Sequence, residues 1–384
     1  MSDSLGRCPG LAFSFFAASI VAACGSVDQG QQVFEPGVGD PGERPPAFLK
    51  FPADTVQAPR AESELPPDFP RLLSQTGAFE DVASMAPRAG LISYEIQAPL
   101  WSDGAIKTRW VSVPELGGIG VLDDDAWRMP EGTVFVKHFE MAMDERQPLV
   151  RRRLETRLLI AAQGGAYYGV TYKWRADNSD AELLLAGVTE SLSITDETGN
   201  QRLQPYLYPS SRDCNTCHNP SAGHVLGMRT RQLNREHAYR SDFPPINQLV
   251  IWAGWGLLDR SFDNTDAQLA PHLAELQDES AELQDRVRSY WDGNCSMCHA
   301  GNTGAVTGWD ARAFTPFADQ GLNEPPRSSS PDTAELLITP GDPGASYIYQ
   351  RGASAEVPLR MPPIGRNRVD GVYLDVLQRW ISSL

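Results

Sequence analysis

Hydrophobic and polar positions alternate in short runs over the first half of the chain. Between residues 71 and 205, runs rich in β-branched and aromatic residues are separated by turn signals. The predicted strands are Thr133–Phe139, Thr156–Ala161, Ala166–Trp174 and Ser191–Thr195. Gly164-Gly165 stands between two of these runs and predicts a hairpin turn. Several short strands at this spacing predict a β-rich, sandwich-like domain over residues 71–205.

From Pro205 onward the hydrophobic positions follow the period of an α-helix instead. Helices are predicted around Pro245–Leu258, Ser280–Trp291 and Asp370–Ser383. In the last of these, apolar residues share one helical face and Asp370 is the predicted N-cap. The expected fold class is therefore α+β and multidomain, with a β-rich N-terminal domain followed by mostly α-helical modules over residues 206–278 and 279–384.

The N-terminus carries an apolar run, Leu11–Ala23, that contains no charge. A helix that spans a bilayer needs roughly 20 apolar residues, so the run is too short and has the length of a signal peptide. Its end, Val21-Ala22-Ala23-Cys24, resembles a bacterial lipobox, in which the cysteine is lipidated and becomes the first mature residue. We therefore expect a lipoprotein signal peptide at residues 1–23, lipidation at Cys24 and an exported protein of the cell envelope or periplasm. The absence of aspartate after Cys24 favours the outer membrane; the alternative is an ordinary cleaved signal that releases the protein.

Residues 24–70 are rich in Gly, Pro, Glu, Asp and Gln and predict a flexible tether. The whole chain has a formal net charge of -16. Such acidity argues against nucleic acid as a partner, because the phosphate backbone is itself anionic. A basic protein partner is compatible with the charge, and so is the simpler explanation that acidity serves solubility.

The chemistry is indicated by a C-x-x-C-H pattern that occurs twice. It comprises Cys214, Cys217 and His218 in the first copy and Cys295, Cys298 and His299 in the second. This is the attachment pattern of c-type haem. Its two thiols form thioethers to the two haem vinyl groups, and the histidine supplies the proximal nitrogen to the iron. The sequence predicts two covalently bound haem c groups, with His218 and His299 as iron ligands.

Two other uses of paired cysteines are less compatible with this sequence. Zinc ribbons place their C-x-x-C pairs roughly 15–20 residues apart, whereas about 80 residues separate these two. A thioredoxin-like redox pair gives no reason for a histidine after both motifs.

The stretch from about Ser280 to Leu384 resembles a class I cytochrome c domain. That family has a helix running into C-x-x-C-H, a distal methionine before proline, and a C-terminal helix. Here Met361 precedes Pro362-Pro363, so the resemblance implies Met361 as the sixth ligand of the second iron. The same resemblance places Pro340-Gly341-Asp342 and Tyr347 around that haem.

The first module, residues 206–278, departs from the class I pattern. Pro205 and Pro209 argue against a helix that leads into Cys214. Three side chains are open candidates for the distal ligand, and an open or water-bound position is a fourth possibility. The candidates are His224, Met228 and His237.

Other conspicuous residues are interpreted as structural. His138, alone in a predicted strand, is expected to be a surface or packed histidine. Trp252 and Trp255 are expected to be packing residues.

The mature chain also resembles bacterial exported dihaem c-type cytochromes. The resemblance is carried by Pro99–Gly104 (PLWSDG), Glu155-Thr156-Arg157, the two haem motifs and Met361-Pro362. It implies an electron-transfer protein that meets redox partner proteins, and an electron carrier rather than an enzyme. The alternatives are a dihaem peroxidase or oxidase with an open catalytic haem at the first motif, and the redox subunit of a larger dehydrogenase or respiratory chain.

Overall fold

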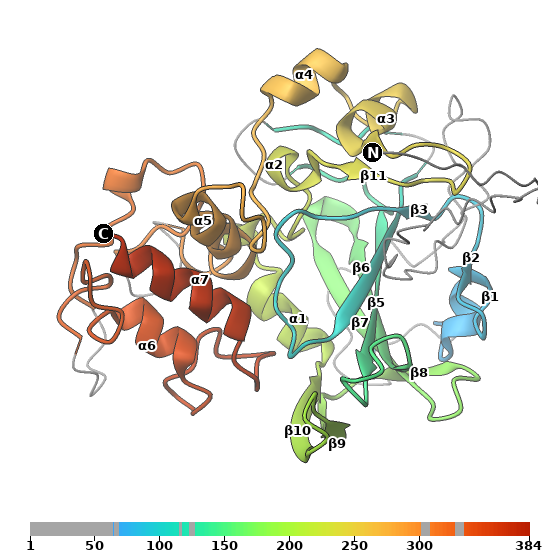
Figure 1. Ribbon diagram of the computed structural model, residues 1–384. Helices are drawn as coiled ribbons and strands as arrows, with labels where there is room; N and C mark the ends of the chain where they lie inside the picture. Colours follow the sequence, from blue (N-terminus) through green and yellow to red (C-terminus); the bar gives the residue numbers. More distant parts are fainter. Residues whose placement is uncertain (1–63, 65–68, 115–116, 123–126, 301–307, 327–333) are drawn as a thin grey trace, which may run out of the picture. The chain divides into compact units, whose positions relative to one another are not determined.

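The computed structural model describes residues 64, 69–114, 117–122, 127–300, 308–326 and 334–384 (Figure 1). The predicted signal peptide, Cys24 and almost all of the predicted tether lie outside the described residues. Within the described part of the chain, no helix is both long and apolar enough to cross a membrane. The described residues form a mixed α+β fold.

A six-stranded antiparallel sheet dominates the first half. Its strands follow one another in chain order, so each pairs with its neighbour in the sequence. They are β3 (Ile92–Ser93), β4 (Ile106–Ser112), β5 (Val134–Ala142), β6 (Arg151–Ala161), β7 (Tyr167–Trp174) and β8 (Ala181–Leu184). The predicted strands over residues 133–139, 156–161 and 166–174 are confirmed as parts of β5, β6 and β7, and Gly164-Gly165 lies in the short turn between the last two.

One face of the sheet is an apolar core. Alternate residues such as Val134 and Val136 point to it, as the two-residue period of a strand requires. The residues that cover this face include Leu73 of a short 3-10 turn, Leu73–Thr76, and Phe79 of β1 (Phe79–Asp81). Met85, just before β2 (Ala86–Pro87), also belongs to this core.

Two separate apolar clusters pack against the opposite face of the sheet. Near one end Phe135 and Leu159 pack with the apolar residues of α3 (Gln248–Gly254). Near the other end Phe139 packs with the hairpin of β9 (Val188–Thr195) and β10 (Gln201–Tyr208). The predicted strand at residues 191–195 is thus part of β9. The other sheets among the described residues have only two strands each, so none of them matches the first sheet in size as the second layer of a sandwich would.

The short helix α1 (Ser211–Cys217) follows the β9–β10 hairpin along the chain and contacts β7. It begins directly after Pro209 and its cap Ser210, and the chain enters it from β10 rather than from a helix, as the two prolines predict. The smaller elements that follow are the 3-10 turn Pro220–Ala222, α2 (Thr230–Leu233), β11 (Glu236–His237), β12 (Ile246–Asn247) and α4 (Asn264–Leu269).

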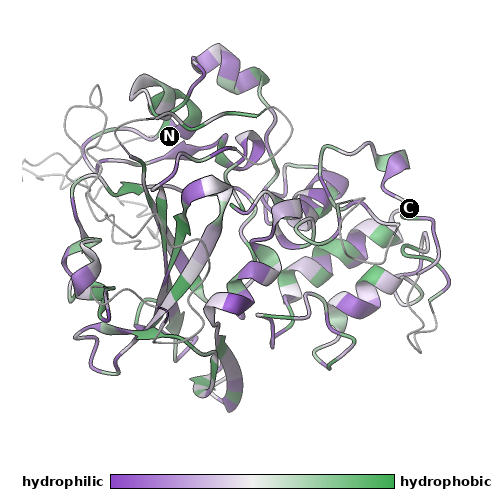
Figure 2. Ribbon diagram, turned by 180° about the vertical axis from the view of Figure 1, so that it is seen from behind, coloured by the Kyte–Doolittle hydropathy of each residue, from purple (hydrophilic) through white to green (hydrophobic). Residues whose placement is uncertain are grey.

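The C-terminal part packs three helices around its own apolar core. They are α5 (Leu283–Asn294), α6 (Tyr347–Ala353) and α7 (Gly371–Ser382); a 3-10 turn, Phe317–Asp319, lies between the first two along the chain. Trp291 of α5 donates its indole N–H to the hydroxyl of Tyr373 on α7 at 2.8 Å. Figure 2 shows hydrophilic and hydrophobic stretches alternating along these helices, as expected of helices that bury one face. The predicted helices over residues 245–258, 280–291 and 370–383 are confirmed, and Asp370 caps α7 by accepting from the Tyr373 backbone N–H.

A loop from the β-rich part, Pro99–Gly104, is bonded to the C-terminal part. The buried carboxylate of Asp103 accepts backbone N–H bonds from Asn367 at 2.6 Å and from Arg368 at 2.7 Å. Trp101 donates its backbone N–H to the side-chain oxygen of Asn294 at 2.7 Å. The loop therefore holds the residues after Met361 and the end of α5 against the β-rich part; the predicted domain boundaries themselves stay predictions.

Candidate functional site

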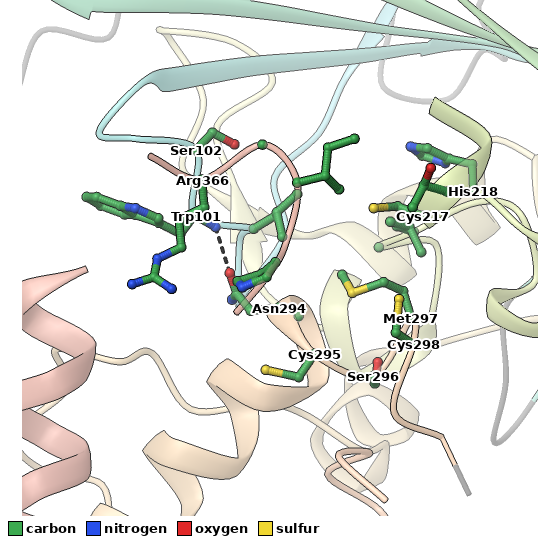
Figure 3. Close-up of a pocket in the computed structure, with 18 of the residues that line it drawn as sticks. Trp101, Ser102, Cys217, His218, Asn294, Cys295, Ser296, Met297, Cys298 and Arg366 are labelled. Atoms are coloured by element: carbon green, nitrogen blue, oxygen red, sulfur yellow. Dashed lines mark hydrogen bonds between the residues drawn. The ribbon is translucent and has the colours of Figure 1, made fainter. Parts of the chain in front are cut away.

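Both C-x-x-C-H motifs line one cavity. The cavity measures about 790 Å³, within the range of about 300–1,000 Å³ that ligand pockets occupy. Figure 3 shows Cys217 and His218 of the first motif on one side of it and Cys295 and Cys298 of the second on another. The amide of Asn219 also reaches the carbonyl of Met297 at 3.5 Å, so the two motifs are close neighbours although they are distant in sequence.

The first motif is positioned by α1. Ser210 caps the helix by accepting from the Asp213 backbone N–H, and the Asp213 carboxylate accepts from the Ser210 backbone in return. Cys214 lies directly against Gly169 of β7. Burial, followed by the neighbouring Cys298 thiol, raises the pKa of Cys217 to about 11, so this thiol is protonated at neutral pH.

His218 is oriented as a metal-binding imidazole. Its Nδ1–H donates to the backbone carbonyl of His224 at 2.6 Å, because a carbonyl can only accept. Burial, above all other causes, lowers the pKa of His218 to about 4, so the ring is neutral at physiological pH. A neutral ring that donates through Nδ1 carries its lone pair on Nε2, the form in which histidine binds a metal.

The second motif is positioned by the end of α5. The Cys295 backbone N–H donates to the Trp291 carbonyl at 2.8 Å, and that of His299 donates to the Cys295 carbonyl at 2.9 Å. The His299 ring lies 4.8 Å from the Trp309 ring, centroid to centroid. Burial, and then the Arg351 guanidinium, lower the pKa of His299 to about 4, so this imidazole is neutral as well.

Met361 lines the same cavity, and its side chain is partly exposed. The segment that carries it is held through its backbone. The Met361 N–H donates to the Arg351 carbonyl at 3.1 Å, and the Met361 carbonyl accepts from the buried guanidinium of Arg366. Its assignment as an iron ligand stays a prediction. Tyr347 also lines the cavity, whereas Pro340-Gly341-Asp342 is not part of its lining; Gly341 donates instead to the Ile381 carbonyl on α7.

None of the three distal candidates of the first module lines the described cavity. Met228 is completely buried in the apolar core beneath α3. The imidazole of His237 bonds to the Ser93 hydroxyl at 2.9 Å. The His224 ring stacks on Tyr167 with centroids 4.8 Å apart. These side chains are engaged elsewhere in the fold.

The residues expected to be structural are indeed packed. Trp252 and Trp255 lie in the same apolar core as Met228. His138 is buried and bonded to the Thr156 hydroxyl, as expected of a packed histidine.

The β-sheet supplies a wall of the cavity, which the sequence did not predict although Arg157 belongs to one of the stretches that carry the family resemblance. Arg109 of β4, Lys137 of β5 and Arg157 of β6 stand directly opposite one another in the strand register, and all three line the cavity. Their only signal along the chain is a basic residue among the alternating positions of a strand. Because the pairing partners are not known before the strands are paired, this signal did not identify them.

The segments that carry the two C-x-x-C-H motifs are also joined by a buried ion pair. The Arg231 guanidinium of α2 donates to the Asp292 carboxylate of α5 at 2.9 Å, and both side chains are almost completely buried. The pair links the segment after the first motif to the helix that precedes the second.

The donor set fits haem better than a cluster of cysteine ligands. None of the four described cysteines takes part in a disulfide. Among the described residues, no group of three or more His, Cys, Asp or Glu side chains is arranged to hold a metal ion. Each motif instead offers two thiols and one neutral imidazole to a shared cavity.

Comparison with family models, with curated proteins and with solved structures finds no match for this chain.

Proposed function

We propose that this protein is an exported electron-transfer cytochrome that carries two covalently bound haem c groups. Cys214 and Cys217 hold one haem and Cys295 and Cys298 hold the other, with His218 and His299 as proximal ligands. The observation that supports this most is that both C-x-x-C-H motifs line a single cavity. When bound, the two haems supply reversible one-electron chemistry.

The chain's own residues prepare the site for that role. The His224 carbonyl fixes the orientation of His218, and such second-shell hydrogen bonds set the tautomer of a ligating histidine. The contact between Asn219 and Met297 keeps the two motifs together, so that an electron would pass between neighbouring groups. Met361 is the proposed sixth ligand of the second iron; a thioether there raises the potential, and Arg366 holds the segment that presents it.

The C-terminal part is proposed to be a class I cytochrome c-like module. Its support is the arrangement of α5, which runs into the second motif, and α7, which packs on α5. The signal peptide, the lipid anchor at Cys24 and an unidentified redox partner protein complete the proposal, and all of these rest on the sequence alone.

A second function is favoured by one observation. His224, Met228 and His237 are all engaged away from the cavity, which leaves the first iron without a distal ligand from its own module. An open sixth position is what a dihaem peroxidase or oxidase needs. In that case the first haem is catalytic and the second supplies it with electrons.

The test is to mature the chain together with haem-attachment machinery and to record its mass, its optical spectra and its low-temperature EPR spectrum. Two covalent haems, both low-spin, support electron transfer. Met361→Ala should then remove the weak near-infrared band of methionine-to-ferric-iron ligation. Replacing Cys214 and Cys217 together by alanine should remove one haem and leave the other. A high-spin haem that reacts with peroxide supports the enzyme instead, and a chain that matures with no haem contradicts both.

A further inference from the structure

Three basic side chains form a row across one face of the sheet. Arg109 is paired in register with Lys137, and Lys137 with Arg157, so the three stand on neighbouring strands and on the same face. Like charges directly opposite one another on adjacent strands are destabilising. A row of three therefore costs stability unless anions compensate it.

The carboxylates around the row compensate it only in part. Arg157 forms two hydrogen bonds to the buried carboxylate of Glu155, at 2.9 and 2.5 Å, and Arg109 reaches Glu95 at 3.4 Å. The three basic groups of the row thus face two carboxylates, and Lys107, a fourth basic side chain on this face, donates to the backbone carbonyl of Leu100 at 2.6 Å. The surplus is at Lys137, whose ammonium lies 5.1 Å from the centre of the Phe139 ring and forms no hydrogen bond or ion pair with the described residues. Burial, and then the guanidinium of Arg109, lower the pKa of Lys137 well below its ordinary value, and an anion beside the amine would raise this pKa again.

A second side chain in the row, Arg109, has one nitrogen without a partner among the described residues. Arg109 is only 4% exposed, and its Nη2 is buried without a hydrogen-bond partner among the described residues. Burying a polar group without a partner is costly, so an unpartnered guanidinium N–H that faces a cavity indicates a missing acceptor.

The position of the row relates these cations to the first motif. Cys214 lies against Gly169 of β7, two residues along that strand from Thr171, which is paired with Arg157. From Arg157 on β6 the row crosses β5 to β4. Strands are spaced by about 4.8 Å, so the row extends about 14 Å away from α1. Arg157, the member nearest to the cysteines, has the Glu155 carboxylate as its partner. Lys137 and the unpartnered Nη2 of Arg109 lie farther from the cysteines.

We propose that Lys137 and Arg109 bind the propionate carboxylates of the haem attached at Cys214 and Cys217, which makes the β-sheet a wall of the first haem site. The inference rests on the proposed function. It follows from the chemistry of haem c, whose thioether bonds form at one edge of the ring while its two carboxylates stand at the opposite edge. One further negative charge balances the row, and a carboxylate oxygen satisfies the unpartnered Nη2 of Arg109.

The same arrangement gives the row an effect on the reduction potential of the first haem. Positive charge beside the ring favours the reduced state, which carries one positive charge less at the iron. Removing that charge should therefore lower the potential of the first haem and leave the potential of the second almost unchanged.

The experiment compares Lys137→Gln, Lys137→Arg and Arg109→Gln in chains that have first been shown by mass to carry two haems. Potentiometric titration followed optically is the readout. Lys137→Gln and Arg109→Gln should each shift the oxidised-to-reduced equilibrium of the first haem about tenfold toward the oxidised form, which is about 59 mV for a one-electron couple. Lys137→Arg keeps the charge and should retain the wild-type potential. Lys173→Gln is the matched control, because Lys173 lies on the same face but is paired with Glu190 at 3.0 Å and is not part of the cavity lining.

Each other result overturns the inference in its own way. Unchanged potentials in both glutamine variants show that the row is not beside the haem carboxylates. A change of spin state in Lys137→Arg shows that Lys137 binds the iron instead, since arginine retains the charge but not an amine. A saturable shift on replacing chloride by acetate in the wild type shows that the row takes a free carboxylate. A chain without haem at the first motif overturns the proposed function together with the inference.

Discussion

The backbone of Gly169 on β7 lies in direct contact with Cys214 on α1. A Cβ built at position 169 would stand 2.9 Å from both the Cβ and the Sγ of Cys214, closer than real Cβ contacts allow. Glycine at this strand position is therefore what lets the first C-x-x-C-H helix lie flat on the sheet.

Gly169→Ala should consequently push α1 away from β7. We expect a loss of stability of about 1–3 kcal/mol, as for other overpacked interiors, and a lower yield of haem at the first motif than at the second. Mass spectrometry of the matured chain counts the haems, and urea unfolding gives the stability. The control is Gly254→Ala on α3, where a Cβ meets nothing within 4 Å. Equal haem content in the two variants would show that the close contact is not needed for attachment.

Gly293, in the last turn of α5, approaches the carbonyl oxygen of Ala98 so closely that a Cβ would overlap with it. Inside a helix, Gly→Ala normally stabilises by roughly 0.5–1 kcal/mol. Here we expect the opposite sign, because α5 would have to separate from the loop that leads to Trp101. The measurement is the free energy of unfolding of Gly293→Ala beside that of Gly371→Ala, a helical glycine with open space around it. A stabilised Gly293→Ala would show that α5 does not pack this closely on the Ala98 backbone.

The buried ion pair between Arg231 and Asp292 should be important for stability. Asp292→Ala leaves the guanidinium in an almost dry site without its carboxylate, which costs about 3–5 kcal/mol. Urea unfolding measures this loss. The exposed pair of Arg240 and Asp242, at 2.8 Å, is the comparison, and Asp242→Ala should leave the unfolding midpoint where it is. Similar losses in both variants would show that burial is not what makes the first pair matter.

His237 should make the protein less stable in mild acid. Burial, and then Arg235, lower its pKa from 6.5 to about 4. Between pH 6.5 and about 4 the unfolded chain therefore binds a proton that the folded chain does not, so stability falls as the pH falls through this window. His237→Gln should make the free energy of unfolding depend less steeply on pH in this window, by the contribution of one proton. Urea unfolding at several pH values measures this dependence. His272→Gln, which replaces an exposed imidazole, is the control. A slope that stays the same in His237→Gln would mean that this histidine does not contribute.

The local elements were predictable because each has its own signal along the chain. The alternation in β5 and β7, the helical period of α5 and α7, and Asp370 at the N-cap all arise from neighbours in sequence. The two C-x-x-C-H motifs are equally local, since their chemistry needs only five consecutive residues.

The assembly of the site was not predictable in the same way. The sequence suggested a β-rich half separate from two haem modules, yet Arg109, Lys137 and Arg157 of the sheet line the same cavity as both motifs. Likewise, Met228 was a reasonable distal candidate by its distance along the chain, and the fold buries it in the core beneath α3.

The sequence by itself thus determined four strands, three helices and the two cysteine–histidine motifs, because short-range periodicity and covalent spacing specify them. It did not predict elements such as β4, β8 and α6. Only the tertiary structure decided that the motifs share one cavity and that a basic row of the sheet lines it. The physical reason is that strand register and close contacts such as that of Gly169 with Cys214 depend on the packing of residues far apart in the chain, which no local pattern records.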